Sequence, residues 1–311
     1  MVGGLVRDPC HRARLDRLQA PALIDSCTVQ QDQPPLFTLV AGDTLAALLR
    51  KAPLPALETR ILASHALGLT RVQLITQSEH PFSAAEAHLL ASLIQRRLAG
   101  EPIAYIVGQR EFFGLPFMVT PAVLIPRPET ELLVELTLER LPQGARVLDL
   151  GTGSGAIAVA IAHQRPDARV TALDASEDAL AIARQNAGHN QVDVRFLHSD
   201  WYAGLDDQHF DVIVANPPYI EKDDPHLTQG DLRFEPANAL TDHADGLSDL
   251  RAIVAGAGRH LAAGGWLLME HGYDQAEAVR ALLAAQGLTQ VQSWQDLAGI
   301  ERVSGASSPK T

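Results

Sequence analysis

The chain has 311 residues, of which 46% are hydrophobic and 20% are charged, so it can bury a sizeable core and is not a disordered chain. Its 37 acidic residues outnumber its 25 basic residues, and the formal net charge of −12 disfavours a duplex-DNA binder, which needs a basic face. Two cysteines exclude a disulfide framework, and no apolar run is long enough to span a bilayer, so we expect a cytoplasmic protein.

Two regions precede the main domain. The first 35 residues show no sustained periodicity, so we expect a flexible extension over residues 1–35. Residues 36–106 carry leucines at helical spacing and predict a small helical bundle. Asp43 and Ser83 are expected to cap two of its helices, and Gly68 is expected to end another.

A hairpin and a second domain follow. Residues 107–122 hold a Gly-Leu-Pro turn between aromatic and branched residues, which predicts a linking β-hairpin. Over residues 123–311, after a helix at 129–141, strand-like apolar runs alternate with helical stretches. This alternation predicts an α/β fold with a Rossmann-like, doubly wound parallel sheet, with strands at residues 146–150, 170–174, 194–197, 210–215 and 266–270.

A glycine-rich loop follows the first of these strands and opens a helix. Glycine lets the backbone turn sharply and approach a ligand, and the helix N-terminus offers free N–H groups. Asp174 ends the second strand, where a carboxylate can accept from both hydroxyls of a ribose. The pattern fits a methyltransferase loop and also a dinucleotide-binding variant. The candidate cofactor-binding residues are Gly151, Thr152, Gly153, Ser154, Gly155 and Asp174.

Ser199, Asp200 and Trp201 end the third strand, on the edge where ligands bind in such sheets. Asp200 is a candidate acceptor for an adenine amino group, and Trp201 is a candidate cover for the ring. The alternative interpretation is a capped loop with a half-buried tryptophan.

The tetrapeptide Asn216-Pro217-Pro218-Tyr219 follows the fourth strand and is the most informative motif of the chain. Pro217 keeps Asn216 out of the helical region, and the prolines lack N–H groups, so carbonyls in this stretch point outward. The Asn216 side-chain oxygen and the Pro217 carbonyl can each accept one N–H of a planar amide or amine. Holding that nitrogen beside a methyl donor favours transfer by orientation alone. Tyr219 offers a face to the flat acceptor.

Other polar residues carry weaker signals. The segment 127–131 suits a helix start, and an equally open interpretation places it at the border of the cofactor cleft. Glu270, at the end of the fifth strand, is a further residue that can border the site. The 12 histidines form no metal-binding pattern, so we expect no metal.

These residues together resemble the peptide chain release factor glutamine methyltransferases of the HemK/PrmC type. The resemblance runs from about Leu39 to Gly299 and includes the helical region, the hairpin, the glycine loop and the Asn-Pro-Pro-Tyr tetrapeptide. Two further segments make it specific, Ile125-Pro126-Arg127-Pro128-Glu129-Thr130-Glu131 and Glu235-Pro236-Ala237-Asn238-Ala239-Leu240. The leader and the tail after Gly299 depart from the family pattern, which leaves the course of the last strand open.

The resemblance implies a cytoplasmic, monomeric enzyme of translation termination that uses S-adenosyl-L-methionine. It would methylate the side-chain amide nitrogen (N5) of glutamine in the Gly-Gly-Gln motif of class-1 release factors, which the helical region would dock. The cofactor would contact Gly151 to Gly155, Asp174, Trp201 and Asn216, and residues Asn216 to Tyr219 would hold the glutamine. No direct nucleic-acid partner and no membrane are expected.

Three other functions are compatible with parts of the sequence. An adenine-N6 nucleic-acid methyltransferase shares the tetrapeptide and the loop, but it normally carries a basic recognition module. A nicotinamide-dependent oxidoreductase leaves the tetrapeptide unexplained. A catalytically silent interaction protein on the same fold ranks last, because all the groups needed for transfer are present.

Overall fold

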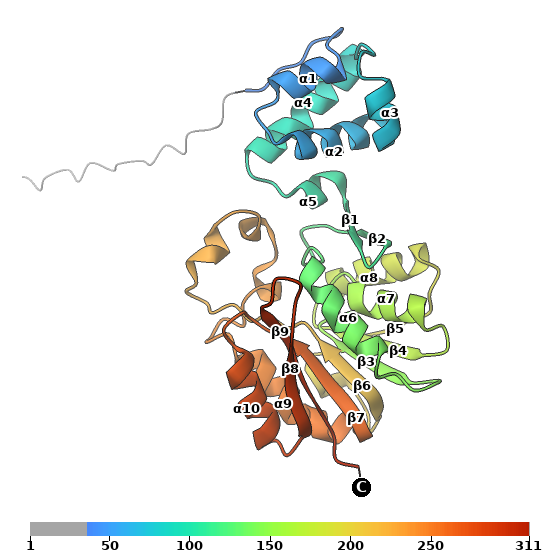
Figure 1. The fold of residues 1–311 in the computed structure, drawn as a ribbon, viewed down its shortest axis with the longest axis vertical. Coiled ribbons are helices and arrows are strands. Elements are labelled where there is room, and N and C mark those ends of the chain that lie inside the picture. The colour runs from blue at the N-terminus through green and yellow to red at the C-terminus, as the bar shows by residue number, and fades with distance from the viewer. Residues whose placement is uncertain (1–35, 311) are drawn as a thin grey trace, which may run out of the picture. The chain divides into compact units, whose positions relative to one another are not determined.

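The computed structural model describes residues 36–310, so the extension predicted for residues 1–35 lies outside the described part of the chain. The first helices form a bundle around one apolar core that includes Leu48, Leu62, Leu90 and Ile94. Figure 1 shows them as α1 (Leu45–Lys51), α2 (Ala56–Leu67), α3 (Arg71–Thr76) and α4 (Ala84–Leu98), followed by the short α5 (Ile103–Val107). The sequence predicted α1, α2 and α4 but not the six-residue α3 or the five-residue α5, which are too short to show a period.

The helix ends follow capping chemistry, with one correction. Ser83 caps α4 in a full capping box with Glu86. Gly68 ends α2 in the left-handed conformation at φ 65°, as predicted. The prediction for Asp43 was wrong, because the neighbouring Thr44 caps α1 and Asp43 instead accepts from Lys51.

The predicted hairpin is present as β1 (Gln109–Phe112) paired antiparallel with β2 (Leu115–Met118). Its two turn residues, Phe113 and Gly114, both have positive φ, at 53° and 75°, which suits the twist of a tight hairpin. Phe112 and Phe117 are buried in the core of the sheet region and meet edge to face at 6.0 Å. The hairpin is therefore anchored by its aromatic side chains.

A seven-stranded sheet confirms the predicted Rossmann-like α/β fold. Its order is β5-β4-β3-β6-β7-β9-β8, and all neighbours are parallel except the pairs made by β9. The five predicted strands are β3 (Arg146–Leu150), β4 (Arg169–Asp174), β5 (Arg195–His198), β6 (Phe210–Ala215) and β7 (Leu261–Glu270). The chain moves outward from β3 to β5 and then returns to β6 beside β3, which creates the crevice where such sheets bind ligands.

Helices cover both faces of this sheet (Figure 1). Alternate strand residues face opposite layers, so Val147 packs with α6 (Glu131–Leu138) and α7 (Ala156–Gln164), while Leu148 packs with α9 (Ser248–His260) and α10 (Ala276–Ala285). The remaining elements are α8 (Glu177–His189), β8 (Thr289–Gln295), β9 (Glu301–Ser307) and the 3-10 turns η1 (Pro128–Thr130), η2 (Trp201–Gly204), η3 (Pro225–Thr228), η4 (Leu232–Phe234) and η5 (Ala237–Ala239).

The structure adds β8, which was not anticipated, and settles the course of the last strand, β9, which the sequence left open. β9 pairs antiparallel with both β7 and β8 at one side of the sheet. The sequence of β8 is rich in threonine, glutamine and serine and has few apolar residues, so it lacks the hydrophobic signal of a buried strand.

Between residues 36 and 310, no helix is long and apolar enough to cross a membrane.

Candidate active site

Strand register brings three separate motifs to one edge of the sheet. Leu150, the last residue of β3, lies beside Leu173 of β4 and beside Ala215 of β6. The glycine loop after β3, Asp174 at the end of β4 and Asn216 after β6 are therefore immediate neighbours, although 65 positions separate Gly151 from Asn216 in the numbering.

A cavity of about 350 Å³ opens at this edge. That volume suits a small-molecule ligand. Most of the predicted site residues line it, namely Gly151, Thr152, Gly153, Ser154, Asp174, Asp200, Trp201, Asn216 and Pro218. Gly155, Pro217 and Tyr219 do not belong to the lining. The edge chosen from the sequence is thus the edge that carries the cavity.

The glycine loop is shaped by backbone requirements at three positions. Gly151 and Gly153 line the cavity with φ of 71° and 55°, a region that other residues rarely adopt. Gly155 also has positive φ, and a Cβ there would lie 3.1 Å from the Cβ of Ala183 and 3.2 Å from its Cα. The third glycine therefore allows α7 to pack closely against α8, while the first two allow the backbone to approach a ligand.

Asp174 holds the loop and keeps accepting capacity. Its Oδ2 accepts from the Gly153 N–H at 2.8 Å, and its Oδ1 accepts from the Ser176 N–H at 2.9 Å. Burial raises the pKa of Asp174, and these two backbone donors oppose that shift. Each carboxylate oxygen retains a further lone pair, so Asp174 can still receive hydroxyls of a bound ligand.

Trp201 lies over the glycine loop. It has a positive φ of 43°, and the Ser199 hydroxyl closes the turn by donating to the Trp201 carbonyl at 2.8 Å. The indole ring would be 3.5 Å from a Cβ placed on Gly151, so it borders the cavity in van der Waals contact. Asp200 is exposed at the rim of the cavity. Asp200 and Trp201 thus both border the cavity next to the glycine loop, at the edge of the sheet expected from the sequence.

The acceptor end is organised around Asn216. Its Nδ2 donates a hydrogen bond of 3.2 Å to Oγ1 of Thr130, which precedes α6. No other hydrogen bond reaches the Asn216 side chain from the part of the chain that the structure describes, so its Oδ1 is available to a ligand. Pro217 is buried and Pro218 lines the cavity.

Tyr219 faces away from the cavity lining and toward Glu270. Its hydroxyl donates to Oε1 of Glu270 at 3.3 Å, and its ring packs in the core beneath the sheet edge. Glu270 is 2% exposed, and its burial raises the pKa of the carboxyl to about 7. Burial likewise raises the pKa of Tyr219. Tyr219 was expected to offer its ring face to the acceptor, but in the structure it lies outside the cavity lining and bonds to the buried Glu270 carboxyl.

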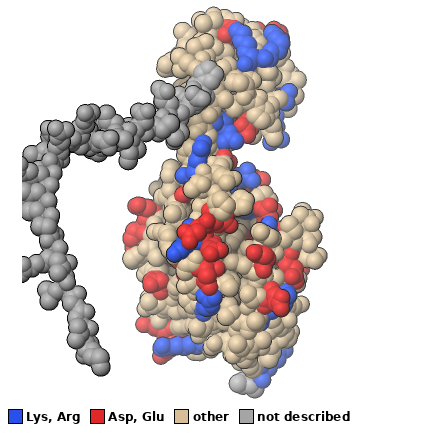
Figure 2. All heavy atoms as spheres, turned by 90° about the vertical axis from the view of Figure 1, so that its left-hand side faces the viewer, with Lys and Arg blue, Asp and Glu red and all other residues tan. Residues whose placement is uncertain are grey.

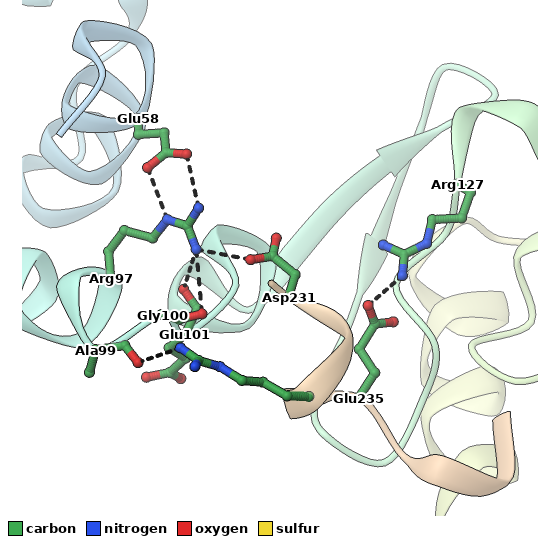
Figure 3. A network of polar contacts seen from close by, with 9 residues as sticks. Glu58, Arg97, Ala99, Gly100, Glu101, Arg127, Asp231 and Glu235 are labelled. Atoms are coloured by element: carbon green, nitrogen blue, oxygen red, sulfur yellow. Dashed lines mark hydrogen bonds and ion pairs between the residues drawn. The ribbon is translucent and has the colours of Figure 1, made fainter. Parts of the chain in front are cut away.

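A connection over residues 220–241 forms one wall of the site. Glu235 has a buried carboxylate that pairs with Arg127 and accepts from the Ile125 N–H at 3.0 Å. Burial raises the pKa of Glu235, and Arg127 opposes this shift. Figure 3 shows Glu235 reaching Arg127 from the connection, while Asp231 of the same connection points to Arg97.

Arg97 joins this wall to the helical bundle. Its guanidinium makes a two-point pair with Glu58 at 2.9 and 3.1 Å and donates to Asp231 at 3.0 Å (Figure 3). Arg233 adds a bond of 3.0 Å to the Ala99 carbonyl. The connection over residues 220–241 is therefore bonded to the helical bundle through Asp231 and Arg233 and to the segment before α6 through Glu235.

Several cavity residues were not among the predicted site residues. Arg127 and Thr130 line the cavity, and the same segment also begins the helical stretch at η1 and α6, so both interpretations of residues 127–131 are confirmed. Asn238 and Asp249 also line it, from the long connection and from α9. Asn238 belongs to the segment Glu235 to Leu240 on which the family resemblance rests, and it lies in a long connection of the kind that tends to shape substrate pockets, whereas Asp249 carries no signal of its own in the sequence.

The connection and its surroundings are acidic. Figure 2 views the molecule from the side on which this connection lies. It shows Asp and Glu side chains gathered near the middle of this face. Residues 220–250 contain two basic residues, Lys222 and Arg233, and eight acidic ones, of which Asp231, Glu235 and Asp245 pair with Arg97, Arg127 and Arg251. The remaining acidic residues are Glu221, Asp223, Asp224, Asp242 and Asp249. Such a face repels a phosphate backbone and attracts a basic partner.

Comparison with known proteins identifies relatives over most of the chain. The family named Methyltransferase small domain matches residues 128–243, and the family named PrmC N-terminal domain matches residues 43–108. A Burkholderia pseudomallei protein named Release factor glutamine methyltransferase is 58% identical over 276 residues, which are 86% of this chain and 96% of that protein. A protein of the same name from Bordetella pertussis is 54% identical and covers 84% of this chain and 98% of its own length.

The fold has a counterpart among solved structures. A crystal structure of a methyltransferase from Pyrococcus furiosus aligns with a TM-score of 0.50 at 22% identity, covering 69% of this chain and 96% of that one. This likeness concerns the fold alone.

Proposed function

We propose that this chain, which belongs to the release factor glutamine methyltransferase family, methylates the side-chain amide nitrogen (N5) of glutamine in the Gly-Gly-Gln motif of class-1 translation release factors. The methyl donor is S-adenosyl-L-methionine. The observation that carries the proposal is the Oδ1 of the cavity-lining Asn216, which has no hydrogen bond within residues 36–310 while Nδ2 is bonded to Thr130.

The cavity suits S-adenosylmethionine in its donor and acceptor groups. Gly151, Thr152, Gly153 and Ser154 would approach its amino-acid end through the backbone, and Asp174 would accept from the ribose hydroxyls. Asp200 and Trp201 would border the adenine. Gly155 contributes by letting α7 begin close to α8. When bound, the cofactor supplies an electrophilic methyl group, whose bond to sulfur breaks as the new bond to nitrogen forms.

The residues of the chain would prepare the nitrogen. A glutamine amide is a weak nucleophile because its lone pair is delocalised into the carbonyl. Asn216 Oδ1 and the Pro217 carbonyl would each accept one of its N–H groups, which fixes the nitrogen and returns electron density to the lone pair. Catalysis then rests on orientation, and the proton leaves to solvent after transfer. Tyr219 would support this arrangement through its bond to Glu270.

The rest of the chain fits a protein substrate. We assign release-factor docking to residues 36–106 and methyl transfer to residues 123–311, with residues 107–122 as the link. The acidic face beside the acceptor end disfavours nucleic acid and suits a basic protein segment (Figure 2). We further propose that the enzyme acts as a monomer in the cytoplasm, the compartment in which translation factors work.

The decisive experiment is mass spectrometry after reaction with a purified release factor and S-adenosylmethionine. We expect a gain of one methyl group on the glutamine of the Gly-Gly-Gln peptide. A parallel reaction offers duplex DNA in place of the release factor. Label found in DNA alone would replace the proposal with an adenine methyltransferase, and binding of NADH instead of S-adenosylmethionine would replace it with an oxidoreductase.

A further inference from the structure

The backbone carbonyl of Tyr219 is bound by a side chain from 56 positions further along the chain. Gln275, the residue before α10, donates from Nε2 to the Tyr219 carbonyl at 3.0 Å and to the Gly246 carbonyl at 3.2 Å. Its Oε1 accepts from the Gly272 N–H at 2.8 Å. A backbone carbonyl only accepts and a backbone N–H only donates, so these three neighbours fix which end of the Gln275 amide meets Tyr219.

Gly246 lies directly against this bond. It has a φ of 76°, in the left-handed region, and a Cβ at this position would lie 2.6 Å from the Tyr219 carbonyl oxygen and 2.9 Å from Nε2 of Gln275. The turn that carries Gly246 is itself held, because the Asp242 carboxylate accepts from three of its backbone N–H groups. The Tyr219 carbonyl therefore meets a closely packed turn as well as the Gln275 side chain.

These contacts fix the C-terminal end of the tetrapeptide. Beside the bound Tyr219 carbonyl, the N–H of Ile220 donates to the Leu240 carbonyl at 3.0 Å. At the other end, Asn216 directly follows β6, a strand paired on both sides with β3 and β7. Two prolines lie between these ends, and their rings fix φ. With both ends held and two dihedral angles fixed, the backbone has little freedom to turn the Pro217 carbonyl.

We propose that Gln275 is a positioning residue, which acts through the Tyr219 carbonyl to keep the Pro217 carbonyl directed at the acceptor nitrogen. Neither Gln275 nor Gly246 belongs to the cavity lining, so both act only through the tetrapeptide. The inference rests on the proposed function, because it assigns the Pro217 carbonyl to the substrate amide. A Pro217 carbonyl that can turn away removes one of the two acceptors that orient the nitrogen, so the cost falls on methyl transfer and not on cofactor binding.

Gln275→Ala provides the first test, because it removes all three hydrogen bonds and leaves the cavity lining intact. We expect kcat to fall by about tenfold or more, with the KM for release factor and the Kd for S-adenosylmethionine within about threefold of wild type. Gln275→Glu keeps the shape and the acceptor for Gly272 but turns a carboxylate toward two carbonyls, so its kcat should fall at least as far. The matched control is Gln286→Ala, whose exposed side chain lies at the other end of α10. A merely structural role would lower the melting temperature of Gln275→Ala and leave its kcat unchanged.

Gly246→Ala tests the same contact from the opposite side. Its methyl group would displace the Tyr219 carbonyl or Gln275, so we expect a loss of kcat of similar size. Gly287→Ala is the control, because its φ of 78° imposes the same backbone strain while a Cβ there meets no atom within 4 Å. Both residues act on one carbonyl, so the double variant should lose little more kcat than either single variant. A wild-type kcat in Gln275→Ala, or losses that multiply in the double variant, would overturn the proposal.

A third readout does not depend on turnover. Hydrogen exchange of the backbone amides of residues 219–222 is measured in the enzyme without substrate. We expect exchange to be about tenfold faster in Gln275→Ala and Gly246→Ala and unchanged in Gln286→Ala and Gly287→Ala. Wild-type exchange rates in the first two variants refute the positioning role. If exchange behaves as expected while the wild-type enzyme methylates no glutamine, the proposed function fails and the positioning of the tetrapeptide stands.

Discussion

Asn216 donates a 3.2 Å hydrogen bond to Thr130, a residue 86 positions earlier in the chain. This bond joins the end of β6 to the start of α6 and leaves Oδ1 as the end of the Asn216 amide that has no hydrogen bond within residues 36–310. It also connects the Asn-Pro-Pro-Tyr tetrapeptide to the segment 127–131, whose sequence resembles an ordinary helix start.

Asn216→Ala should fold, bind S-adenosylmethionine at least weakly, and lose about 100-fold or more of the transfer rate. The reason is that a positioned hydrogen-bond partner in an active site typically contributes this much. Initial rates with methyl-labelled cofactor measure the effect, with Asn190→Ala, directly after α8, as the control outside the cavity lining. Near-normal turnover of Asn216→Ala would contradict the acceptor role.

Asp174→Ala should weaken S-adenosylmethionine binding by about 10-fold to 100-fold, because bonds to a charged acceptor contribute about 1.5–3 kcal/mol. Isothermal calorimetry gives the Kd directly. The exposed Asp193→Ala is the control in the loop before β5 and should keep the wild-type Kd. Equal affinity of the two variants would remove Asp174 from the cofactor site.

Asp149 should make the free energy of unfolding depend on pH. Burial raises the pKa of its carboxyl to about 7 from an ordinary value of 3.8, so between these values the folded state holds a proton that the unfolded chain releases. This contribution to stability is present at low pH and is lost as pH rises toward about 7 and above. Asp149→Asn removes the titration and keeps an acceptor for the Thr152 hydroxyl.

We therefore expect Asp149→Asn to gain stability relative to wild type by about 2 kcal/mol or more between pH 5 and pH 8. Urea unfolding of the cofactor-free protein at the two pH values checks this. The exposed Asp178→Asn on α8 should stay within about 0.5 kcal/mol of wild type, as surface substitutions do. A pH-independent effect of Asp149→Asn would show that the carboxyl stays ionised throughout.

Asn186→Ala should destabilise the protein by about 2–4 kcal/mol. The Asn186 side chain is 1% exposed, bonds to both backbone groups of Met118, and donates to the Ser154 carbonyl, so its loss removes one buried and two partly buried hydrogen bonds. Asn190→Ala is the matched control, because Asn190 also donates to the hairpin, at Pro116, from a less buried position. Equal losses of stability would contradict a larger contribution from the more buried hydrogen bonds of Asn186.

Asp231→Ala should raise the KM for release factor by about threefold to fivefold and leave the Kd for S-adenosylmethionine unchanged. The Asp231 side chain is 46% exposed, so its pair with Arg97 contributes at most about 1 kcal/mol. Its loss loosens the connection that carries Glu235 and Asn238. Asp223→Ala on the same connection, 80% exposed, is the control. A changed cofactor Kd would show that the connection supports the whole cavity.

The sequence by itself determined five of the seven strands of the sheet and the edge of the sheet that carries the cavity. These follow from local rules: apolar runs of strand length, glycine at positive φ in Gly151 and Gly153, and prolines that shape the backbone after Asn216. Such signals are contained in a few consecutive residues, so they can be recognised before the chain is folded.

Only the tertiary structure decided which way Asn216 faces, that Tyr219 is tied to Glu270, that Gly155 serves packing, and that β9 inserts beside β7. Each of these depends on residues brought together from distant parts of the chain. Burial and hydrogen-bond direction are properties of such assembled neighbours, and no spacing along the sequence encodes them.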